Sequence, residues 1–169
     1  LPEAVVEGIT SQYGDALPLF CDPVSSAYAR RLKPYVGKVH TLKPNRMELT
    51  VLTGHDTDTP KGVKAACEML LCRGVKRIFV SMGHEGCLYM DSEGNVVQRA
   101  LSPIENIANA SGAGDAFTAA VIYSYLKGFG INRTIDYALA AGAVAVSAAT
   151  TINPEISPEL IEKIIIERG

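Results

Sequence analysis

The chain has 169 residues, 47% of them hydrophobic and 20% charged, and these proportions are typical of one globular domain with a single sizeable core. Its formal net charge is −2 and it has no concentrated run of Lys and Arg, which argues against a nucleic-acid partner or an anionic membrane surface. No apolar stretch has the roughly 18 residues of a membrane-spanning helix. The four cysteines lack CxxC spacing and nothing predicts export, so a reducing cytoplasm is expected.

Helical and strand patterns alternate along the chain, which predicts an α/β fold with a mainly parallel sheet flanked by helices, in one domain spanning residues 1–169. In chain order we expect a helix at 3–12, a strand at 17–21, a helix from Ser25 or Ser26 to Leu32, a strand at 39–42, a helix from Asn45 to Leu52, a helix at 60–73, a strand at 77–82, a hairpin of strands 87–90 and 96–99, and helices at 116–126, 133–149 and 158–168. Pro34, Pro44, Gly54 and Gly74 supply the stop signals between them.

A glycine-rich run stands where a polar loop turns into an apolar helix. Gly112, Ala113 and Gly114 come directly before Asp115, and an apolar stretch long enough for three helical turns follows. Backbone N–H groups at a helix N-terminus attract negative charge, so these residues are candidates for an anion cradle. Asp115 has two interpretations: it stabilises the first turn of the helix, or it takes a proton from a hydroxyl nucleophile beside the bound anion.

Several further polar residues and glycines fall at or just past predicted strand ends, where α/β folds bind ligands. They are Asp22, Asn45, Glu48, Ser81 and Gly83. Each also has a purely structural interpretation, since Asp22 precedes a proline turn and Asn45 can cap a helix. Glu48, three residues after Asn45, fits a capping box almost as well as a magnesium or phosphate site.

Four motifs together resemble the ribokinase-like family of carbohydrate and nucleoside kinases, also called the phosphofructokinase-B family. GAGDAF at 112–117 resembles its second signature, DPV at 22–24 its strand-end motif, PNRME at 44–48 its PNxxE motif, and SMGHEG at 81–86 its glycine turn. The order and spacing of the four are more specific than any one. The resemblance implies a three-layer αβα sandwich, of which this chain is the C-terminal, nucleotide-binding and catalytic part.

Within the family, four stretches are most similar to the pseudouridine-kinase branch. They are DPVS at 22–25, HTLKPNRMEL at 40–49, VSMG at 80–83 and INPEIS at 152–157. The implied reaction is ATP-dependent phosphorylation of a hydroxymethyl group on a sugar or nucleoside, with pseudouridine as the first candidate acceptor. Ribokinase, fructokinase and adenosine-type kinase remain alternatives within the family.

The resemblance also implies a role for each matching residue. Asp115 is the expected general base, and the amides of Gly112, Ala113 and Gly114 are expected to stabilise the transferring group. Asn45 and Glu48 are expected to organise the ATP phosphates and Mg²⁺, with Glu48 acting through water.

Further matching positions are implied on the nucleotide side. Ser81, Gly83 and Gly86 resemble the turn that touches the phosphates and ribose of ATP, although the two glycines also suit a tight bend. Ala140 and Ala143 belong to the helix expected to pack against adenine. A monovalent cation such as K⁺, and a homodimer of the full-length protein, are left open.

Two features depart from the family pattern. Asn109 stands where many relatives have an aspartate, which weakens the expectation of a cation site more than that of the anion cradle. The first family signature and the lid are also missing, so we expect the chain to be a fragment without activity of its own.

A dinucleotide-dependent oxidoreductase is disfavoured because GxGxxG would need glycine at Phe117, and a P-loop NTPase because Gly-Lys-Ser/Thr is lacking. A non-catalytic nucleotide-binding module remains the alternative of another class.

Overall fold

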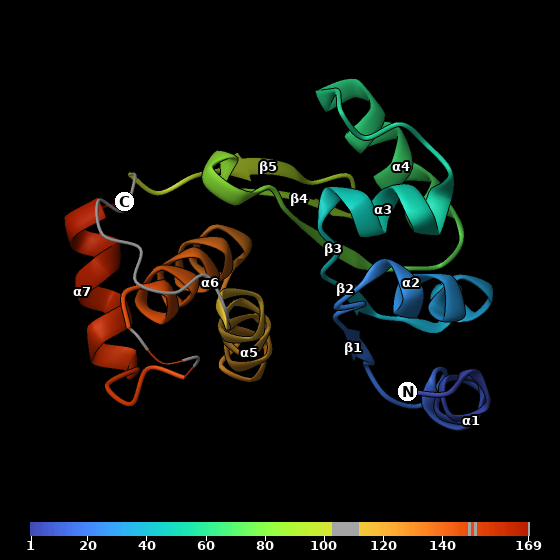
Figure 1. The fold of residues 1–169 in the computed structure, drawn as a ribbon, viewed down its shortest axis with the longest axis horizontal. Helices are drawn as coiled ribbons and strands as arrows, with labels where there is room; N and C mark the ends of the chain where they lie inside the picture. Colours follow the sequence, from blue (N-terminus) through green and yellow to red (C-terminus); the bar gives the residue numbers. More distant parts are fainter. Residues whose placement is uncertain (103–111, 149, 151, 169) are drawn as a thin grey trace. The chain divides into compact units, whose positions relative to one another are not determined.

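The computed structural model describes residues 1–102, 112–148, 150 and 152–168 (Figure 1). Its elements are α1 (Glu3–Tyr13), β1 (Phe20–Cys21), α2 (Ser26–Leu32), the 3₁₀ helix η1 (Lys33–Lys38), β2 (Thr41–Leu42), α3 (Arg46–Thr53), α4 (Pro60–Cys72), β3 (Arg77–Ser81), the 3₁₀ turn η2 (Gly83–Glu85), β4 (Cys87–Asp91), β5 (Val96–Arg99), α5 (Ala113–Leu126), α6 (Ile131–Val146) and α7 (Pro158–Arg168).

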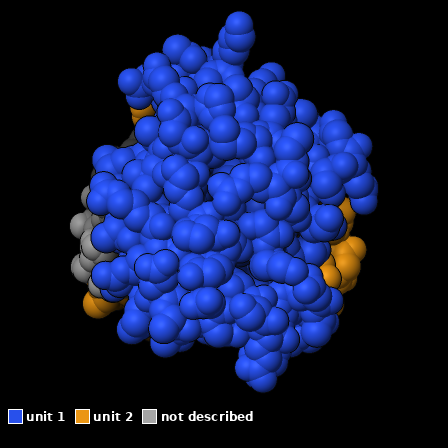
Figure 2. All heavy atoms as spheres, turned by 90° about the vertical axis from the view of Figure 1, so that its right-hand side faces the viewer, with its two compact units in different colours: residues 1–82, 88–97 blue, residues 83–87, 98–169 orange. Residues whose placement is uncertain are grey.

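The described chain divides into two compact units, coloured separately in Figure 2. Unit 1 comprises residues 1–82 and 88–97, and unit 2 comprises residues 83–87 and 98–169. Unit 1 therefore contains α1 to α4 and most of the sheet, whereas unit 2 contains α5, α6 and α7.

The sheet has five strands in the order β1-β2-β3-β4-β5, and β1, β2 and β3 run parallel. Phe20 lies opposite Thr41, and Leu42 lies opposite both Cys21 and Ile78. Helices provide the connections between these three strands, as parallel pairing requires. The predicted α/β class with a mainly parallel, helix-flanked sheet is thus confirmed.

The core of unit 1 lies between this sheet and helices α2, α3 and α4. α2 packs against α3, and α3 packs against α4 (Figure 1). Its fully buried apolar side chains include Leu42, Leu49, Leu52, Leu70, Ile78 and Val80. Burial of a Leu or Ile side chain contributes about 1.5–3 kcal/mol each, so these residues supply much of the drive to form the unit.

Local sequence signals account for where α3 and α4 begin and end. The Asn45 side chain accepts a hydrogen bond from the N–H of Glu48 at the start of α3, and Gly54 ends that helix in the left-handed conformation with φ 85°. Thr59 caps α4, with Pro60 in its first turn. Asn45, Gly54 and Pro60 stand at the helix ends where the sequence predicts them, and the Thr59 cap is an addition that the structure shows.

Unit 2 is built on the pairing of α5 with α6, which in turn packs against α7. A Cβ added to Gly142 of α6 would lie 3.6 Å from the carbonyl oxygen of Ala113 at the start of α5. The two helix backbones therefore approach closely where α5 begins. Tyr123 of α5 stacks on Tyr137 of α6 with ring centroids 5.4 Å apart, which secures the pair near its other end.

Some elements differ from the prediction in extent. The strands expected at 17–21 and 39–42 pair over only two residues each, because Leu17 is 55% exposed and the chain pairs with its neighbour only from Phe20 onward. Pro34 does not simply end the preceding helix but enters the first turn of η1. Helix α5 begins at Ala113 and not at 116, so the glycine-rich run forms its first turn.

Across the described residues, none of the helices combines the length and apolarity needed to cross a membrane.

Candidate functional site

The ends of β1 and β2 bring two opposite charges together in unit 1. Because Cys21 pairs with Leu42, the residues that follow them, Asp22 and Lys43, leave the sheet side by side. The Lys43 ammonium lies 2.7 Å from the Asp22 carboxylate, and the two side chains are 9% and 14% exposed. The N–H of Lys43 also donates to the carbonyl of Cys21. Removal of either member of a charge pair so far removed from water leaves an uncompensated buried charge, which is strongly destabilising.

The predicted binding residues Asn45 and Ser81 lie next to each other. They form a parallel bridge between Asn45, just beyond β2, and Ser81, the last residue of β3, and the N–H of Ser81 donates to the carbonyl of Pro44 over 2.9 Å. Parallel strands have their carboxyl ends at the same edge of a sheet. The pairing of β2 with β3 therefore brings together two motifs that are more than thirty positions apart in the sequence.

Glu48 forms a capping box with Asn45, which is the structural one of the two roles predicted for it from the sequence. Its Oε2 accepts a hydrogen bond from the N–H of Asn45 over 2.9 Å, and the N–H of Glu48 donates to Asn45 Oδ1 over 2.8 Å. Only 3% of Glu48 is exposed. Burial raises the pKa of this carboxyl and the charge of Asp22 raises it further, while the Asn45 N–H and the Lys43 ammonium oppose the rise.

These residues also fit a magnesium ion held together with nucleotide phosphates. The Lys43 ammonium contacts the Asp22 carboxylate directly and also acts electrostatically on Glu48, so two carboxyl groups and one ammonium lie in the same region. Among the described residues no group of three or more His, Cys, Asp and Glu side chains forms a cage. Mg²⁺ is usually held by one or two carboxylates, with water and phosphate oxygens completing its shell, and this arrangement matches that habit.

We expect Glu48→Gln to keep the fold while it removes the buried carboxyl group. Glutamine maintains the capping box, because it too can accept from the Asn45 N–H. Because the pKa of Glu48 is higher in the folded chain than in the unfolded chain, folding favours the protonated carboxyl group. The resulting stabilisation is fully present below the unfolded pKa of about 4.3. It is lost as the pH rises through the folded pKa. The free energy of unfolding of the variant, measured by urea titration between pH 4 and 8, should therefore depend less on pH and be no lower at neutrality.

The matched control for this change is Glu48→Ala, which removes the cap and should cost about 1 kcal/mol. If Glu48→Gln destabilises the chain as much as Glu48→Ala, the role assigned to the buried charge is wrong.

Lys43 and the turn after β1 are features that the sequence analysis missed. Val24 has φ 63°, a conformation that β-branched residues avoid, and its N–H donates to Asp22 Oδ1 over 3.1 Å. This turn holds the carboxylate on Lys43. The available signal was a lysine directly after a predicted buried strand, since such a position buries a charge only when a partner is near.

In unit 2 the predicted anion cradle forms the first turn of α5. Gly112 is the N-cap residue with φ 85°, no side chain caps the helix in the part of the chain that the structure describes, and the first intrahelical bond runs from the N–H of Ala116 to the carbonyl of Gly112. The N–H groups of Ala113, Gly114 and Asp115 therefore lack acceptors within the helix. Asp115 itself is exposed. Asn109, the residue that weakens the expectation of a monovalent-cation site, lies outside the described residues.

The two glycines of the turn after β3 are placed differently. Gly83 has φ 61° and open space where a Cβ would be, so its backbone is accessible to a ligand. Gly86 has φ 83°, and a Cβ there would collide with the carbonyl oxygen of Arg99. Close packing is thus sufficient to explain Gly86, whereas a role in nucleotide binding stays a prediction for both.

We expect Gly86→Ala to destabilise the chain more than Gly94→Ala. Both glycines have positive φ, 83° and 91°, so both substitutions cost about 1–2 kcal/mol for the left-handed backbone. Only Gly86 adds a collision, because nothing lies within 4 Å of the Cβ position at Gly94. Urea unfolding of the two variants measures the difference, and equal losses would contradict the packing role.

The predicted adenine-packing residues Ala140 and Ala143 lie on α6, whose Gly142 faces the start of α5. Ala140 is 0% exposed and Ala143 is 9% exposed. Ala143 is therefore nearer to the surface of this unit than Ala140 and is the better candidate for contact with a ligand.

Comparison with known proteins agrees with these motifs. The model of the pfkB family of carbohydrate kinases matches residues 2–158. The chain belongs to this family. It is 32% identical over 142 residues to pseudouridine kinase from Escherichia coli K12, a match that covers 83% of this chain and 45% of that protein. It is 29% identical over 167 residues to 1-phosphofructokinase from Haemophilus influenzae, covering 98% of this chain and 52% of that protein.

Solved structures of pfkB-like kinases share the fold. A Clostridium perfringens protein assigned as a sugar kinase superposes with a TM-score of 0.92 at 25% identity, covering 100% of this chain and 53% of its own. An E. coli protein assigned as ribokinase II, solved with ATP and Mg²⁺, superposes with a TM-score of 0.82 at 25% identity, covering 97% of this chain and 53% of its own. The pfkB chain described here spans about half the length of the relatives it matches.

Proposed function

We propose that this chain is the nucleotide-binding and catalytic-base part of an ATP-dependent kinase that phosphorylates a hydroxymethyl group of a sugar or nucleoside. One observation carries the proposal: in the described part of the chain, the first turn of α5 has no side-chain cap and leaves the N–H groups of Ala113 and Gly114 without acceptors inside the helix, with the exposed Asp115 in the same turn. A pure anion site would be weakened by a carboxylate there, whereas a general base needs one beside the phosphate.

In this proposal each residue of the turn has a chemical task. The acceptor oxygen attacks the γ-phosphorus, its proton passes to the Asp115 carboxylate, and the bond from phosphorus to the β–γ bridging oxygen breaks to release ADP. The amides of Gly112, Ala113 and Gly114 donate to the transferring group, where negative charge is spread over its oxygens. The positive end of the α5 dipole adds to their effect.

The cluster at the strand ends of unit 1 is proposed to hold the remaining part of the nucleotide. Lys43 and Asn45 donate to phosphate oxygens, Ser81 and Gly83 approach from the neighbouring strand end, and Glu48 with Asp22 would hold Mg²⁺ through water. When bound, Mg²⁺ neutralises charge on the phosphates. The solved E. coli neighbour that contains ATP and Mg²⁺ supports this choice of cofactors. K⁺ stays a prediction.

Pseudouridine is the acceptor that we propose first, on the strength of the 32% identity to a pseudouridine kinase. A phosphorylated fructose is the second candidate, since 1-phosphofructokinase matches over nearly the whole chain. Ribokinase, fructokinase and adenosine-type kinase activities remain alternatives. A non-catalytic nucleotide-binding module on the same fold is the rival class, and Asp115 is the residue that such a module would not need.

The decisive experiment is a substrate panel with the protein in which this chain is joined to the other half of the kinase fold. Pseudouridine, fructose 1-phosphate, ribose and deoxyribose are tested with ATP and Mg²⁺, and ADP release is measured. Turnover with none of them, together with retained ATP binding, would favour the binding module. The 169-residue chain alone is expected to bind ATP without turnover, because the oriented acceptor is missing.

Location and assembly follow the same proposal. All four cysteines are free thiols, which suits the reducing cytoplasm that we propose for this kinase. Burial beside Asp22 and Glu48 raises the pKa of Cys21 to about 12, so this thiol stays protonated and unreactive. A homodimer of the full-length protein stays a prediction.

A further inference from the structure

The connection between α3 and α4, residues 54–59, contains a buried polar side chain. Asp56, Asp58 and Thr59 are exposed, as is usual for a surface loop, whereas Thr57 is only 3% exposed. A hydroxyl group removed from water is costly unless it forms hydrogen bonds. The burial of Thr57 therefore requires partners inside unit 1.

The hydrogen bonds of the Thr57 hydroxyl lead to α3. Its Oγ1 donates to the carbonyl of Arg46 over 2.8 Å and lies 2.7 Å from Thr50 Oγ1. A threonine hydroxyl has a single proton. Because Thr57 gives this proton to the Arg46 carbonyl, the Thr50 hydroxyl must be the donor in the second bond. Thr57 thus joins the first residue of α3 to a residue one turn later.

Arg46 stands in the first turn of α3 between two residues of the candidate nucleotide site. Asn45 precedes it as the N-cap, and Glu48 follows it at the third helical position. The capping box orients Asn45 and Glu48 relative to each other. Their direction relative to the sheet depends on how this turn is attached to other elements.

Three attachments of the turn are seen in the described part of the chain. Asn45 bridges to Ser81 at the end of β3. The Arg46 guanidinium donates to Met82 Sδ over 3.6 Å, and Met82 belongs to the core of unit 1. Thr57 provides the third attachment, on the carbonyl of Arg46. The first two lead to the end of β3, and the third leads to the loop before α4.

The loop that carries Thr57 is itself held in place. Thr59 Oγ1 accepts a hydrogen bond from the N–H of Gly62 over 3.1 Å, and the N–H of Asp58 donates to Asp56 Oδ1 over 2.9 Å. A Cβ added to Gly62 would collide with the carbonyl oxygen of Asp56, so the loop lies directly against the first turn of α4. A loop fixed in this way can impose a fixed position on the start of α3.

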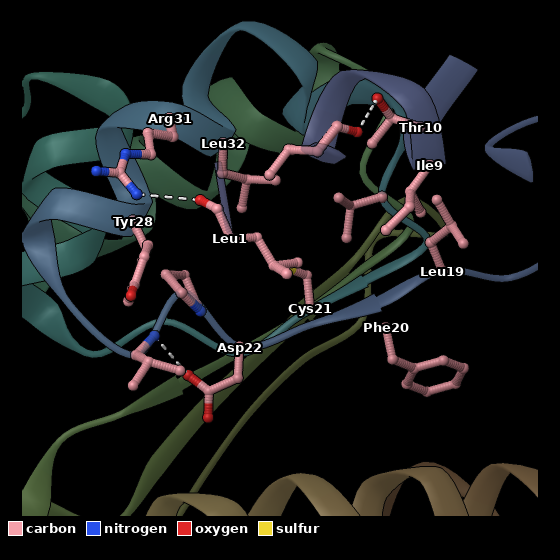
Figure 3. Close-up of a pocket in the computed structure, with 14 residues that line it drawn as sticks. Leu1, Ile9, Thr10, Leu19, Phe20, Cys21, Asp22, Tyr28, Arg31 and Leu32 are labelled. Carbon is pink, nitrogen blue, oxygen red and sulfur yellow. Dashed lines mark hydrogen bonds between the residues drawn. The ribbon is translucent and has the colours of Figure 1, made fainter. Parts of the chain in front are cut away.

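Asp22, the other carboxylate of the candidate site, is held by different contacts. It lies in the wall of a cavity between α1, β1 and α2 (Figure 3). Its carboxylate accepts from the N–H of Val24 in its own turn over 3.1 Å and contacts the Lys43 ammonium. A change in the α3–α4 loop should therefore displace the start of α3 and leave Asp22 in place.

We propose that Thr57 is a positioning residue for the nucleotide site. Its hydroxyl fixes the carbonyl of Arg46 and with it the first turn of α3. This turn holds Asn45 and Glu48 in the direction that binding of the phosphates and Mg²⁺ requires. The inference rests on the proposed function, which assigns those two residues to the nucleotide. A misplacement on the order of 1 Å can lower the efficiency of a site by about 10²-fold, so a hydroxyl that does not touch the nucleotide is sufficient for a measurable effect.

The test compares variants of the complete kinase, in which this chain is joined to the other half of the fold. Thr57→Val removes the hydroxyl and keeps the shape of the side chain. The KM for ATP and the Mg²⁺ concentration that gives half-maximal rate are measured with the acceptor that supports turnover. We expect both to rise at least about tenfold. The kcat at saturation should change less than about twofold, because an interaction that serves binding alone changes KM and not kcat.

Two further variants are the controls. Thr57→Ser should restore both constants, since serine can make the same two hydrogen bonds. Thr59→Ala removes the cap of α4 in the same loop and should lower the urea midpoint about as much as Thr57→Val, yet leave both constants unchanged. Circular dichroism checks that each variant folds, and Thr57→Ala takes the place of valine if the added methyl group is not accommodated. Unchanged constants in Thr57→Val, no restoration in Thr57→Ser, or an equal rise in Thr59→Ala overturns the proposal.

Hydrogen exchange keeps this inference separate from the kinase reaction. The N–H of Glu48 should exchange with deuterium at least about tenfold faster in Thr57→Val than in Thr59→Ala, as expected when the turn opens more often. Faster exchange with weaker binding of ATP and Mg²⁺ by calorimetry supports the positioning role even if no acceptor is phosphorylated, in which case the kinase reaction alone fails. Turnover by the unchanged protein with equal exchange in the two variants overturns the positioning role alone. A protein that binds no ATP overturns both.

Discussion

Asp115→Asn should lower kcat of the complete kinase by about 10²–10⁴-fold, the contribution expected of a positioned general base. Asparagine is nearly the same size and preserves the first turn of α5, but its amide cannot accept the proton of the attacking hydroxyl. The KM for ATP should change little, because in the proposed function the Asp115 side chain serves the acceptor hydroxyl and is not a ligand of the nucleotide. Steady-state kinetics over a range of pH measures both constants.

The matched control for this substitution is Asp136→Asn in the same unit. Asp136 pairs with Arg99 through a 2.7 Å contact on the surface and lies on α6, so its loss should leave kcat unchanged. The low-pH limb of the kcat profile, which reports titration of the base, should vanish only in Asp115→Asn. An unchanged kcat in this variant would remove Asp115 from the reaction.

Lys43→Met should lower the free energy of unfolding of the chain by about 3–5 kcal/mol, the usual cost of leaving buried charge without its partner. The ammonium is the positive member of a cluster that also holds the carboxylates of Asp22 and Glu48. Methionine fills a similar volume, so the loss reports charge more than packing. Urea unfolding followed by circular dichroism measures it.

A surface ion pair of the same unit supplies the control for Lys43→Met. Lys38 lies 2.7 Å from Asp15, with side chains 49% and 82% exposed, so Lys38→Met should cost no more than about 1 kcal/mol. The double variant Asp22→Asn with Lys43→Met should recover part of the loss, because one uncompensated carboxylate is removed. Equal losses for Lys38→Met and Lys43→Met would show that burial does not strengthen the pair at β1.

Local signals were sufficient to predict the ends of α3 and the start of α4. Asn45, Gly54 and Pro60 act within one turn of their own positions, and each stands at the helix end that it predicted. The strands were harder, because a two-residue strand such as β1 exists only through its partner β2. Its length depends on register and neighbours, neither of which is encoded in a pattern of five apolar residues.

The candidate site also has features that the sequence predicts and features that it leaves open. The sequence by itself predicted that Asn45 and Ser81 would lie at strand ends on one edge of the sheet, because parallel strands carry their C-terminal ends to one place. Asp115 was identified from its position after the glycines, although its role stays a prediction. Glu48 retained both of its interpretations, since its capping box leaves one carboxylate oxygen for a cation.

Only the tertiary structure decided how the charges and surfaces combine. The pairing of Asp22 with Lys43 depends on strand register, and the φ of Val24 depends on the turn that this pairing imposes. The start of α5 at Ala113 became visible once its hydrogen bonds were placed. The place of β1 at the end of the strand order likewise has no local signature, because an edge strand and a central strand can have the same apolar pattern.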